Sequence, residues 1–140
     1  MKYILLTSAF YAKYANCPEI EHKVNRPYIQ IVVKIENNIF AVPLRSNINH
    51  NNVLWTDKAN KCGIDFSKAV IITDYNNEVD KSQPYIRQNE FNSLRGKEYI
   101  IQKKLENYIK TYKEAKENLN IQRNIIICKY STLQYFEDLI

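Results

Sequence analysis

Three polar side chains that suit phosphate chemistry lie close together in the first half of the chain. Arg45, Ser46 and His50 fall within six residues of one another. An arginine offers a permanent positive charge and a planar set of donors for phosphate oxygens. A serine hydroxyl can donate or relay a proton, and a histidine titrates near neutral pH, which suits proton transfer. Together they indicate a phosphate-binding, proton-moving site; the alternative is that each is an ordinary loop residue in water.

A β-hairpin is expected to position these three residues. An alternating run over residues 28–35 is followed by a second β-rich run from Ile39 to Leu44. Asn37 and Asn38 separate the runs, and because asparagine tolerates positive φ they predict a tight turn. Pro43 cannot donate a ladder hydrogen bond, so we expect an edge or a bulge there, where the strand leaves the sheet. The loop beyond it then forms a polar tip exposed to water.

The pleat of the first hairpin strand separates two sets of side chains. One set is apolar and is expected to lie in the core: Ile29, Ile31, Val33 and Ile35. The other set is too polar for a core and is expected to face water or a ligand: Tyr28, Gln30, Val32 and Lys34. On that face a tyrosine can stack on a base and a lysine can bind a phosphate, although Lys34 can equally be a solubilising charge.

Composition predicts one globular domain over residues 1–140. Hydrophobic residues make up 45% and charged residues 25% of the chain, which are ordinary values for a folded domain. The net charge of +5 favours an anionic partner, although many basic proteins have none. Eleven tyrosines supply core residues or amphipathic surfaces for stacking bases.

Cysteine usage and hydropathy predict a soluble, cytoplasmic protein. Cys17, Cys62 and Cys128 are odd in number and widely spaced, so reduced thiols are expected rather than disulfides or a zinc site. No stretch approaches the roughly 20 apolar residues that a membrane helix needs. No cofactor or metal-ligand cluster is indicated, and neither is a glycine-rich phosphate loop.

The remaining pattern favours an α+β fold with a mainly antiparallel sheet. Expected strands are Lys2–Leu6, Ala69–Thr73 and a short one at Tyr85–Arg87, with an irregular stretch from Asn47 to Lys61. Expected helices are one capped by Thr7 or Ser8, one capped by Asn89 and ended by Gly96, and one starting at Ser131. Apolar residues at 4,3,4,3,4 spacing from Ile101 to Leu119 predict a long amphipathic helix whose stripe is core, the alternative being a surface for a partner helix.

Several segments also resemble the toxins of type III toxin–antitoxin systems, the group that contains ToxN, AbiQ, TenpN and CptN, and look closest to the CptN/TenpN branch. The resemblance extends roughly from Pro27 to the end of the chain. The matching segments are Asn25 to Tyr28, Ala41 to Ser46 with His50, Gly63 to Ile72, Tyr108 to Tyr112, and Cys128 to Leu133.

This resemblance implies a metal-independent endoribonuclease with a compact, strongly twisted sheet and surrounding helices, similar to the toxin Kid. It implies cleavage of cellular RNA by 2′-OH attack, giving 2′,3′-cyclic phosphate and 5′-OH ends. It also implies inhibition by a cognate repeat-derived RNA, with pseudoknot repeats, in a closed toxin–RNA assembly; no DNA partner is expected. The predicted catalytic residues are Arg45, Ser46, His50 and Tyr28, and the predicted RNA-binding residues are Arg26, Gln30, Lys34 and Asn47.

One departure from the family pattern leaves the acid and the base open. The ToxN branch has a lysine two residues after its serine, where this chain has Ile48. The work of that cation is then expected to fall to Arg45, Lys34 or His50. Two other function classes stay open: a non-catalytic RNA-binding regulator using the same basic, tyrosine-rich face, and a module that binds a protein through the long helix. A serine hydrolase has little support because no G-x-S-x-G motif is present.

Overall fold

The structure is a computed structural model that describes residues 1–21 and 27–140, and the predicted α+β class is confirmed. Its strands are β1 (Tyr3–Ile4), β2 (Gln30–Ile35), β3 (Asn38–Arg45), β4 (Val53–Asp57), β5 (Cys62–Asp65) and β6 (Val70–Ile72). The α-helices are α1 (Ser8–Lys13), α2 (Tyr75–Glu78), α3 (Gln88–Leu94), α4 (Glu98–Glu117) and α5 (Gln122–Tyr130). Three 3-10 helices complete the described residues: η1 (Phe66–Lys68), η2 (Thr132–Tyr135) and η3 (Glu137–Leu139).

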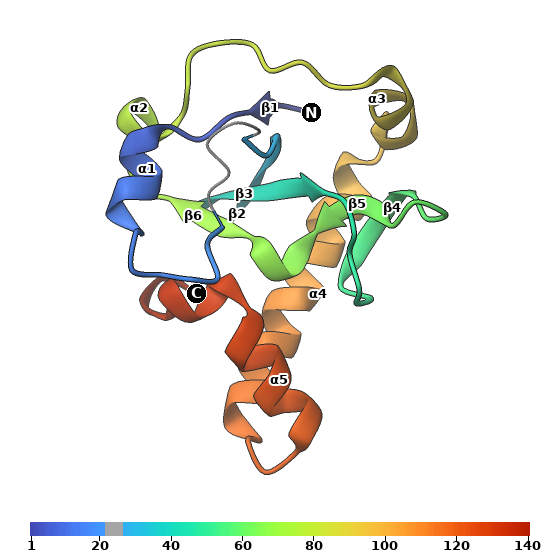
Figure 1. The fold of residues 1–140 in the computed structure, drawn as a ribbon. Coiled ribbons are helices and arrows are strands. Elements are labelled where there is room, and N and C mark those ends of the chain that lie inside the picture. The colour runs from blue at the N-terminus through green and yellow to red at the C-terminus, as the bar shows by residue number, and fades with distance from the viewer. Residues whose placement is uncertain (22–26) are drawn as a thin grey trace.

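Strand β3 is the centre of the sheet (Figure 1). The described strands pair antiparallel in the order β1-β2-β3-β5-β4, and β6 also pairs with β3. On one side β3 pairs with β2 along most of its length. On the other side Ile39 to Ala41 pair with β6, whereas Leu44 and Arg45 pair with β5. The end of β3 therefore lies where two partner strands diverge.

Pro43 marks that divergence rather than a sheet edge. It lies opposite Gln30 of β2, between the stretch of β3 that pairs with β6 and the stretch that pairs with β5. The next amide, Leu44 N–H, donates to Ile29 O across the hairpin at 2.8 Å. Because N–H groups alternate sides along a strand, the missing N–H of Pro43 is on the other side, at the gap between β6 and β5. The prediction that the strand leaves the sheet at Pro43 was wrong. Proline is nevertheless tolerated there for the expected reason, because no ladder hydrogen bond requires its missing N–H.

The β2–β3 hairpin forms as predicted, with its turn one residue earlier. Ile35 pairs with Asn38, so Glu36 and Asn37 are the two turn residues. Glu36 takes the positive φ, at 53°, although asparagine is the better residue for it. Because the side-chain period of a strand is two, the burial of Ile31 and Val33 fixes the register, and the turn follows from it.

Helices lie against both faces of the sheet. Phe40 of β3 lies opposite Val33 and, with Ile35, faces Ile109 of α4. The other face carries Gln30, which lies beneath Tyr11 of α1 and is only 4% exposed. The expectation that Gln30 faces water or a ligand was therefore wrong, because α1 covers that end of the polar face.

The long helix agrees with its predicted pattern. Residues Ile101, Leu105, Tyr108, Tyr112 and Ala115 are buried in α4, while Leu119 lies beyond the end of the helix and is exposed. Thr7 caps α1 by accepting from Phe10 N–H at 3.2 Å, and Gly96, at φ 75°, follows α3. Ser131 accepts from Leu133 N–H, but the segment that it caps is the 3-10 helix η2. No helix in the described ranges is long and apolar enough to cross a bilayer.

Five elements of the described residues were not predicted. Two of them are the short helices η1 and α2. Strands β4 and β5 lie in or directly after the stretch expected to be irregular, and α5 follows the long helix as the second arm of a projecting helical pair (Figure 1). The expected strand at Tyr85–Arg87 is instead an extended connection that leads into α3.

The two outermost strands of the main path are short and irregular. β1 has two residues, and β4 has five, with a shift of register between Trp55 and Asp57. Ser93 of α3 lies against β4, where its hydroxyl donates to Thr56 O at 3.4 Å.

Candidate functional site

The candidate site is built where β3 and β5 meet. Arg45 lies opposite Gly63, and because side chains alternate along a strand, Asp65 points to the same face as Arg45. A Cβ on Gly63 would lie 2.4 Å from Leu54 O of β4, so only glycine permits this close approach. The pairing thus brings an arginine and an aspartate together from positions twenty residues apart.

Asp65 is the hub of a buried polar cluster. Its side chain is fully buried, and its carboxylate accepts from Arg45 Nη1 at 2.7 Å and from Ser67 Oγ at 2.6 Å. It also accepts from Ser67 N–H at 3.0 Å and lies 3.2 Å from His50 Nε2. A buried carboxylate needs such donors because it has lost its hydration. The cluster therefore fixes the Arg45 guanidinium.

These contacts shift the pKa of both charged partners in opposite directions. Burial alone would raise the pKa of the Asp65 carboxyl, but the hydrogen bonds from His50, Ser67 and Arg45 outweigh it, so that pKa lies below its ordinary value. Burial alone would lower the pKa of the Arg45 guanidinium, but the hydrogen bond and charge of Asp65, with the charge of Glu21, raise it. Both groups are therefore held in their charged forms.

His50 points into this cluster rather than outward. Its Nδ1 accepts from Asn52 N–H at 3.1 Å, which places the proton of the neutral ring on Nε2. Nε2 faces both Asp65 Oδ1 and Ser67 Oγ at 3.2 Å. Both ring nitrogens are thus engaged by the protein, and Nε2 lies within hydrogen-bond distance of Asp65.

The outer side of Arg45 meets a second carboxylate. Arg45 Nη2 donates to Glu21 Oε2 at 3.0 Å, and the Tyr28 hydroxyl donates to the same oxygen at 3.0 Å. The guanidinium carbon also lies 5.6 Å from the centre of the Tyr28 ring, a cation–π distance. Arg45 is consequently held by a buried carboxylate on one side and a partly exposed one on the other.

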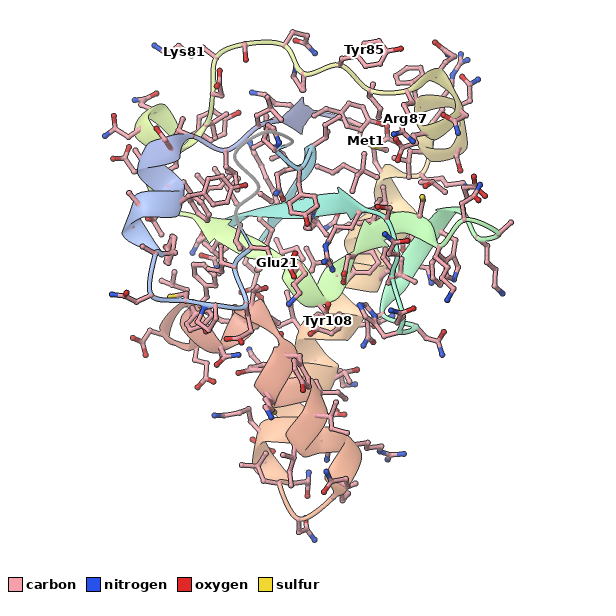
Figure 2. All side chains as sticks on the ribbon, viewed as in Figure 1. Met1, Glu21, Lys81, Tyr85, Arg87 and Tyr108 are labelled. Carbon is pink, nitrogen blue, oxygen red and sulfur yellow. The ribbon has the colours of Figure 1, made fainter. Side chains whose placement is uncertain are left out.

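A groove of about 330 Å³ opens beside this cluster. Among the residues that line it are Tyr28, Arg45 and Ser46, together with Arg87 and Glu90. Tyr85, 83% exposed, lies on its outer rim, and Figure 2 shows Tyr85 and Arg87 on the connection that leads to α3. The volume of the groove is at the lower end of the 300–1,000 Å³ that is typical of small-molecule sites.

The structure brings three of the predicted catalytic residues, Tyr28, Arg45 and Ser46, to one groove and places His50 behind Arg45. Of the predicted RNA-binding residues, Asn47 is exposed beside Ser46 with φ 57°. Lys34 is exposed but pairs with Ile39 near the hairpin turn, at the other end of β2 from the groove. Gln30 is buried, which leaves it no access to RNA, and Arg26 lies outside the described residues.

Ile48, which stands where the ToxN branch has lysine, anchors the loop. Its side chain is 3% exposed and its N–H donates to Lys61 O at 3.1 Å. His50 is directed inward as well. The loop that was expected to be a polar tip is therefore partly buried, through Ile48, and partly hydrogen-bonded to the rest of the protein, through His50. Only Ser46, Asn47 and Asn49 of this loop are exposed between Arg45 and His50.

Sequence reasoning gave no role to Asp65, Ser67, Glu21 or Arg87. Asp65 carried a usable signal, because a single acid between Ile64 and Phe66 in an apolar run indicates a buried, paired carboxylate. Asp65 with Ser67 is also an Asx-type pattern, with the side chain accepting from the amide two residues on. Glu21 and Arg87 carried no local signal, since tertiary structure alone brings them to Arg45 and Ser46.

Replacing His50 by alanine should lower the free energy of unfolding by about 1–3 kcal/mol, because the buried Asp65 carboxylate loses a donor. This exceeds the roughly 0.5 kcal/mol expected for an exposed loop residue. His50→Gln keeps an N–H near the Nε2 position and should lose less. Urea denaturation measures both, with Asn49→Ala as the control in the same loop. Equal stability of His50→Ala and Asn49→Ala would contradict a positioning role.

The described residues contain no group of three or more His, Cys, Asp or Glu side chains placed to hold a metal ion. Comparison of the chain with protein-family models, curated proteins and solved structures found no match.

Proposed function

We propose that this protein is the toxin of a type III toxin–antitoxin system, a metal-independent endoribonuclease restrained by a cognate RNA in the cytoplasm. The observation that carries the proposal is the groove, where Ser46 and Tyr28 hydroxyls lie with two guanidinium groups, Arg45 and Arg87. These groups can bind a phosphodiester and stabilise charge that develops on it. The family resemblance supplies the reaction, and the single-core α+β fold is compatible with the toxin fold it implies.

In the proposed reaction the ribose 2′-oxygen attacks the neighbouring phosphorus and the bond from phosphorus to the 5′-oxygen breaks. The 2′-OH proton must be accepted, and the leaving 5′-oxygen must receive a proton. Arg45 and Arg87 stabilise the phosphorane charge. The Ser46 hydroxyl passes its proton to the leaving 5′-oxygen and takes one from water, so that the serine ends in its starting form.

Glu90 is the residue that we expect to accept the 2′-OH proton. It is the carboxylate among the residues that line the groove. The Cys62 thiol also lines the groove, but burial, with the charges of Asp57 and Glu90, raises its pKa, so the thiolate is disfavoured. His50 acts as a positioning residue in this scheme, because Asn52 N–H and Asp65 engage its ring nitrogens.

RNA cleavage should persist in excess EDTA, because the groove supplies its own cations and proton-transfer groups. The purified protein is incubated with bulk RNA, and the new ends are tested for 2′,3′-cyclic phosphate and 5′-OH. The Ser46→Ala variant, purified in the same way, serves as the control, because cleavage by that preparation would reveal a contaminating nuclease. Loss of cleavage in EDTA with recovery in magnesium or manganese would reject the mechanism.

A second candidate is a non-catalytic RNA-binding regulator. The inward position of His50 favours it, because the side chain best suited to proton transfer is engaged by the protein. Such a protein would bind RNA with an affinity that falls steeply with salt and would leave the RNA uncut. The end-group assay separates it from the nuclease.

A further inference from the structure

One oxygen of Glu21 lies where a phosphate oxygen would be expected. Glu21 Oε2 accepts from Arg45 Nη2 and from the Tyr28 hydroxyl, each at 3.0 Å. Figure 2 shows the Glu21 side chain pointing from the segment after α1 toward the sheet. A cation and a hydroxyl that converge on one anionic oxygen are the same donors that bind a phosphodiester. The carboxylate therefore resembles an internal ligand.

Arg45 is held in place independently of Glu21. Arg45 Nη1 is bonded to the fully buried Asp65 at 2.7 Å, and the Arg45 side chain is only 18% exposed. Glu21 is 42% exposed and comes from a different segment of the chain. Partly exposed ion pairs contribute little to stability, whereas breaking the buried pair is costly. Glu21 can leave while Arg45 stays in place.

A second cation, the Lys68 ammonium group, belongs to the surroundings of Glu21. Lys68 lines, with Glu21, Tyr28 and Arg45, a small cavity of about 20 Å³. Its Nζ donates to Tyr130 O at 3.2 Å, which ties it to the end of α5. Burial lowers the pKa of Lys68, the charge of Glu21 acts against that shift, and the charge of Arg45 adds to it. The charges of Lys68 and Arg45 thus repel each other, and the charge of Glu21 offsets that repulsion.

Glu21 is one of three carboxylates near these two cations. Arg45 and Lys68 carry two positive charges, whereas Asp65, Glu21 and Glu19, which also lines the cavity, carry three negative ones. Asp65 accepts from Arg45 Nη1, and Glu19 accepts from the Tyr135 hydroxyl. Removal of Glu21 therefore leaves two charges of each sign and takes away the acceptor that Arg45 Nη2 and the Tyr28 hydroxyl share, which suits the binding of a phosphate group.

We propose that Arg45, Tyr28 and Lys68 form a subsite for one phosphate of an RNA backbone, and that Glu21 occupies it in the free protein. The RNA part of this proposal rests on the proposed function, whereas anion binding does not. Glu21 acts as a competitor, so a phosphate must displace it before binding. The apparent association constant for phosphate equals the intrinsic constant multiplied by the fraction of the protein whose site is open.

The test compares Glu21→Ala with Glu117→Ala, which makes the same change in net charge on the exposed end of α4. Binding of inorganic phosphate is measured by calorimetry at fixed ionic strength. If Glu21 fills the site about nine-tenths of the time, its removal should lower the Kd for phosphate about tenfold. The control should show no comparable change, and Tyr28→Phe added to Glu21→Ala should reverse part of the gain.

Phosphate binding that is unchanged in a folded Glu21→Ala protein would overturn the subsite. Should that variant fail to fold, Glu21→Gln keeps the side chain's shape and removes only its charge, and it should show a smaller gain in the same direction. Equal Kd values for Glu21→Gln and Glu117→Gln would then reject the proposal.

The failure of the subsite and that of the proposed function are distinguishable. RNA cleavage by the wild-type protein without any effect of Glu21 on phosphate binding would reject the subsite alone. Tighter phosphate binding in Glu21→Ala with no cleavage of RNA by any variant would retain the subsite and reject the nuclease.

Discussion

Replacing Asp65 by alanine should lower the free energy of unfolding by about 3–5 kcal/mol, the usual cost of removing one partner from a buried ion pair. Its carboxylate accepts from Arg45, Ser67 and the Ser67 amide and lies beside His50. Without it the Arg45 guanidinium loses its buried counter-charge and three further donors lose an acceptor. Chemical denaturation at neutral pH measures the effect.

Asp138→Ala is the matched control, because Asp138 is exposed in η3. Asp65→Asn retains the shape and one acceptor oxygen but not the charge, so it should fall between the wild type and Asp65→Ala. A loss for Asp65→Ala no larger than that of Asp138→Ala would mean that the cluster does not stabilise the fold.

The Asp65 carboxylate should also make the free energy of unfolding depend on pH in the acidic range. Hydrogen bonds from His50, Ser67 and Arg45 outweigh the effect of burial and hold the pKa of Asp65 below its ordinary value of 3.8. A carboxyl whose pKa is lower when folded stabilises the protein fully above the unfolded value and loses that contribution as pH falls through the folded one. The Asp65→Asn protein should therefore lose less stability below pH 3.8 than the wild type.

Replacing Ser46 by alanine should reduce RNA cleavage by about 10²–10⁴-fold, the usual effect of removing a proton-transfer group. Ser46 is exposed in the groove, so the free energy of unfolding should change by no more than about 0.5 kcal/mol. Under the proposed function the cognate RNA should still bind, because protein–nucleic acid contacts are generally spread over many phosphates and bases. Single-turnover cleavage, thermal melting and RNA affinity are measured on one preparation.

Ser82→Ala is a suitable control for Ser46→Ala, because Ser82 is an exposed serine in the connection after α2 and does not line the groove. It should cleave RNA at the wild-type rate. Full activity of Ser46→Ala would place the chemistry away from this loop. Loss of both cleavage and RNA binding would assign Ser46 to binding.

Elements with a strong local period could be predicted from the sequence. The stripe from Ile101 to Ala115 is buried in α4, and Ile31 and Val33 lie in the core as the alternation predicts. β4 was missed because five residues between asparagine-rich ends are too short to show a period, and α5 because its apolar residues are not buried on one side. Such elements are formed by contacts with neighbours, which a local pattern does not contain.

The candidate site also has a part that the sequence predicts and a part that depends on tertiary structure. Arg45 and Ser46 are consecutive, so the sequence alone placed them together. The inward direction of His50 depends on Asp65, which lies near it because Asp65 pairs with Val53 in the β4–β5 hairpin. Arg45 joins them because β5 also pairs with β3. Gln30 was misplaced for a related reason, since its burial requires Tyr11 of a helix that precedes it in the chain. Residue type alone led to the proposed chemistry, which stays a prediction, and tertiary pairing decided which side-chain atoms are accessible.

The outermost strands also bear on aggregation. A long, flat sheet edge is a template for pairing with another chain. Here β1 has only two residues, and β4 is interrupted between Trp55 and Asp57, with Ser93 of α3 bonded to Thr56 O. Irregular, covered edges resist such pairing. If an RNA of repeated units gathers several copies at high local concentration, their sheets can lie close without joining into a fibre.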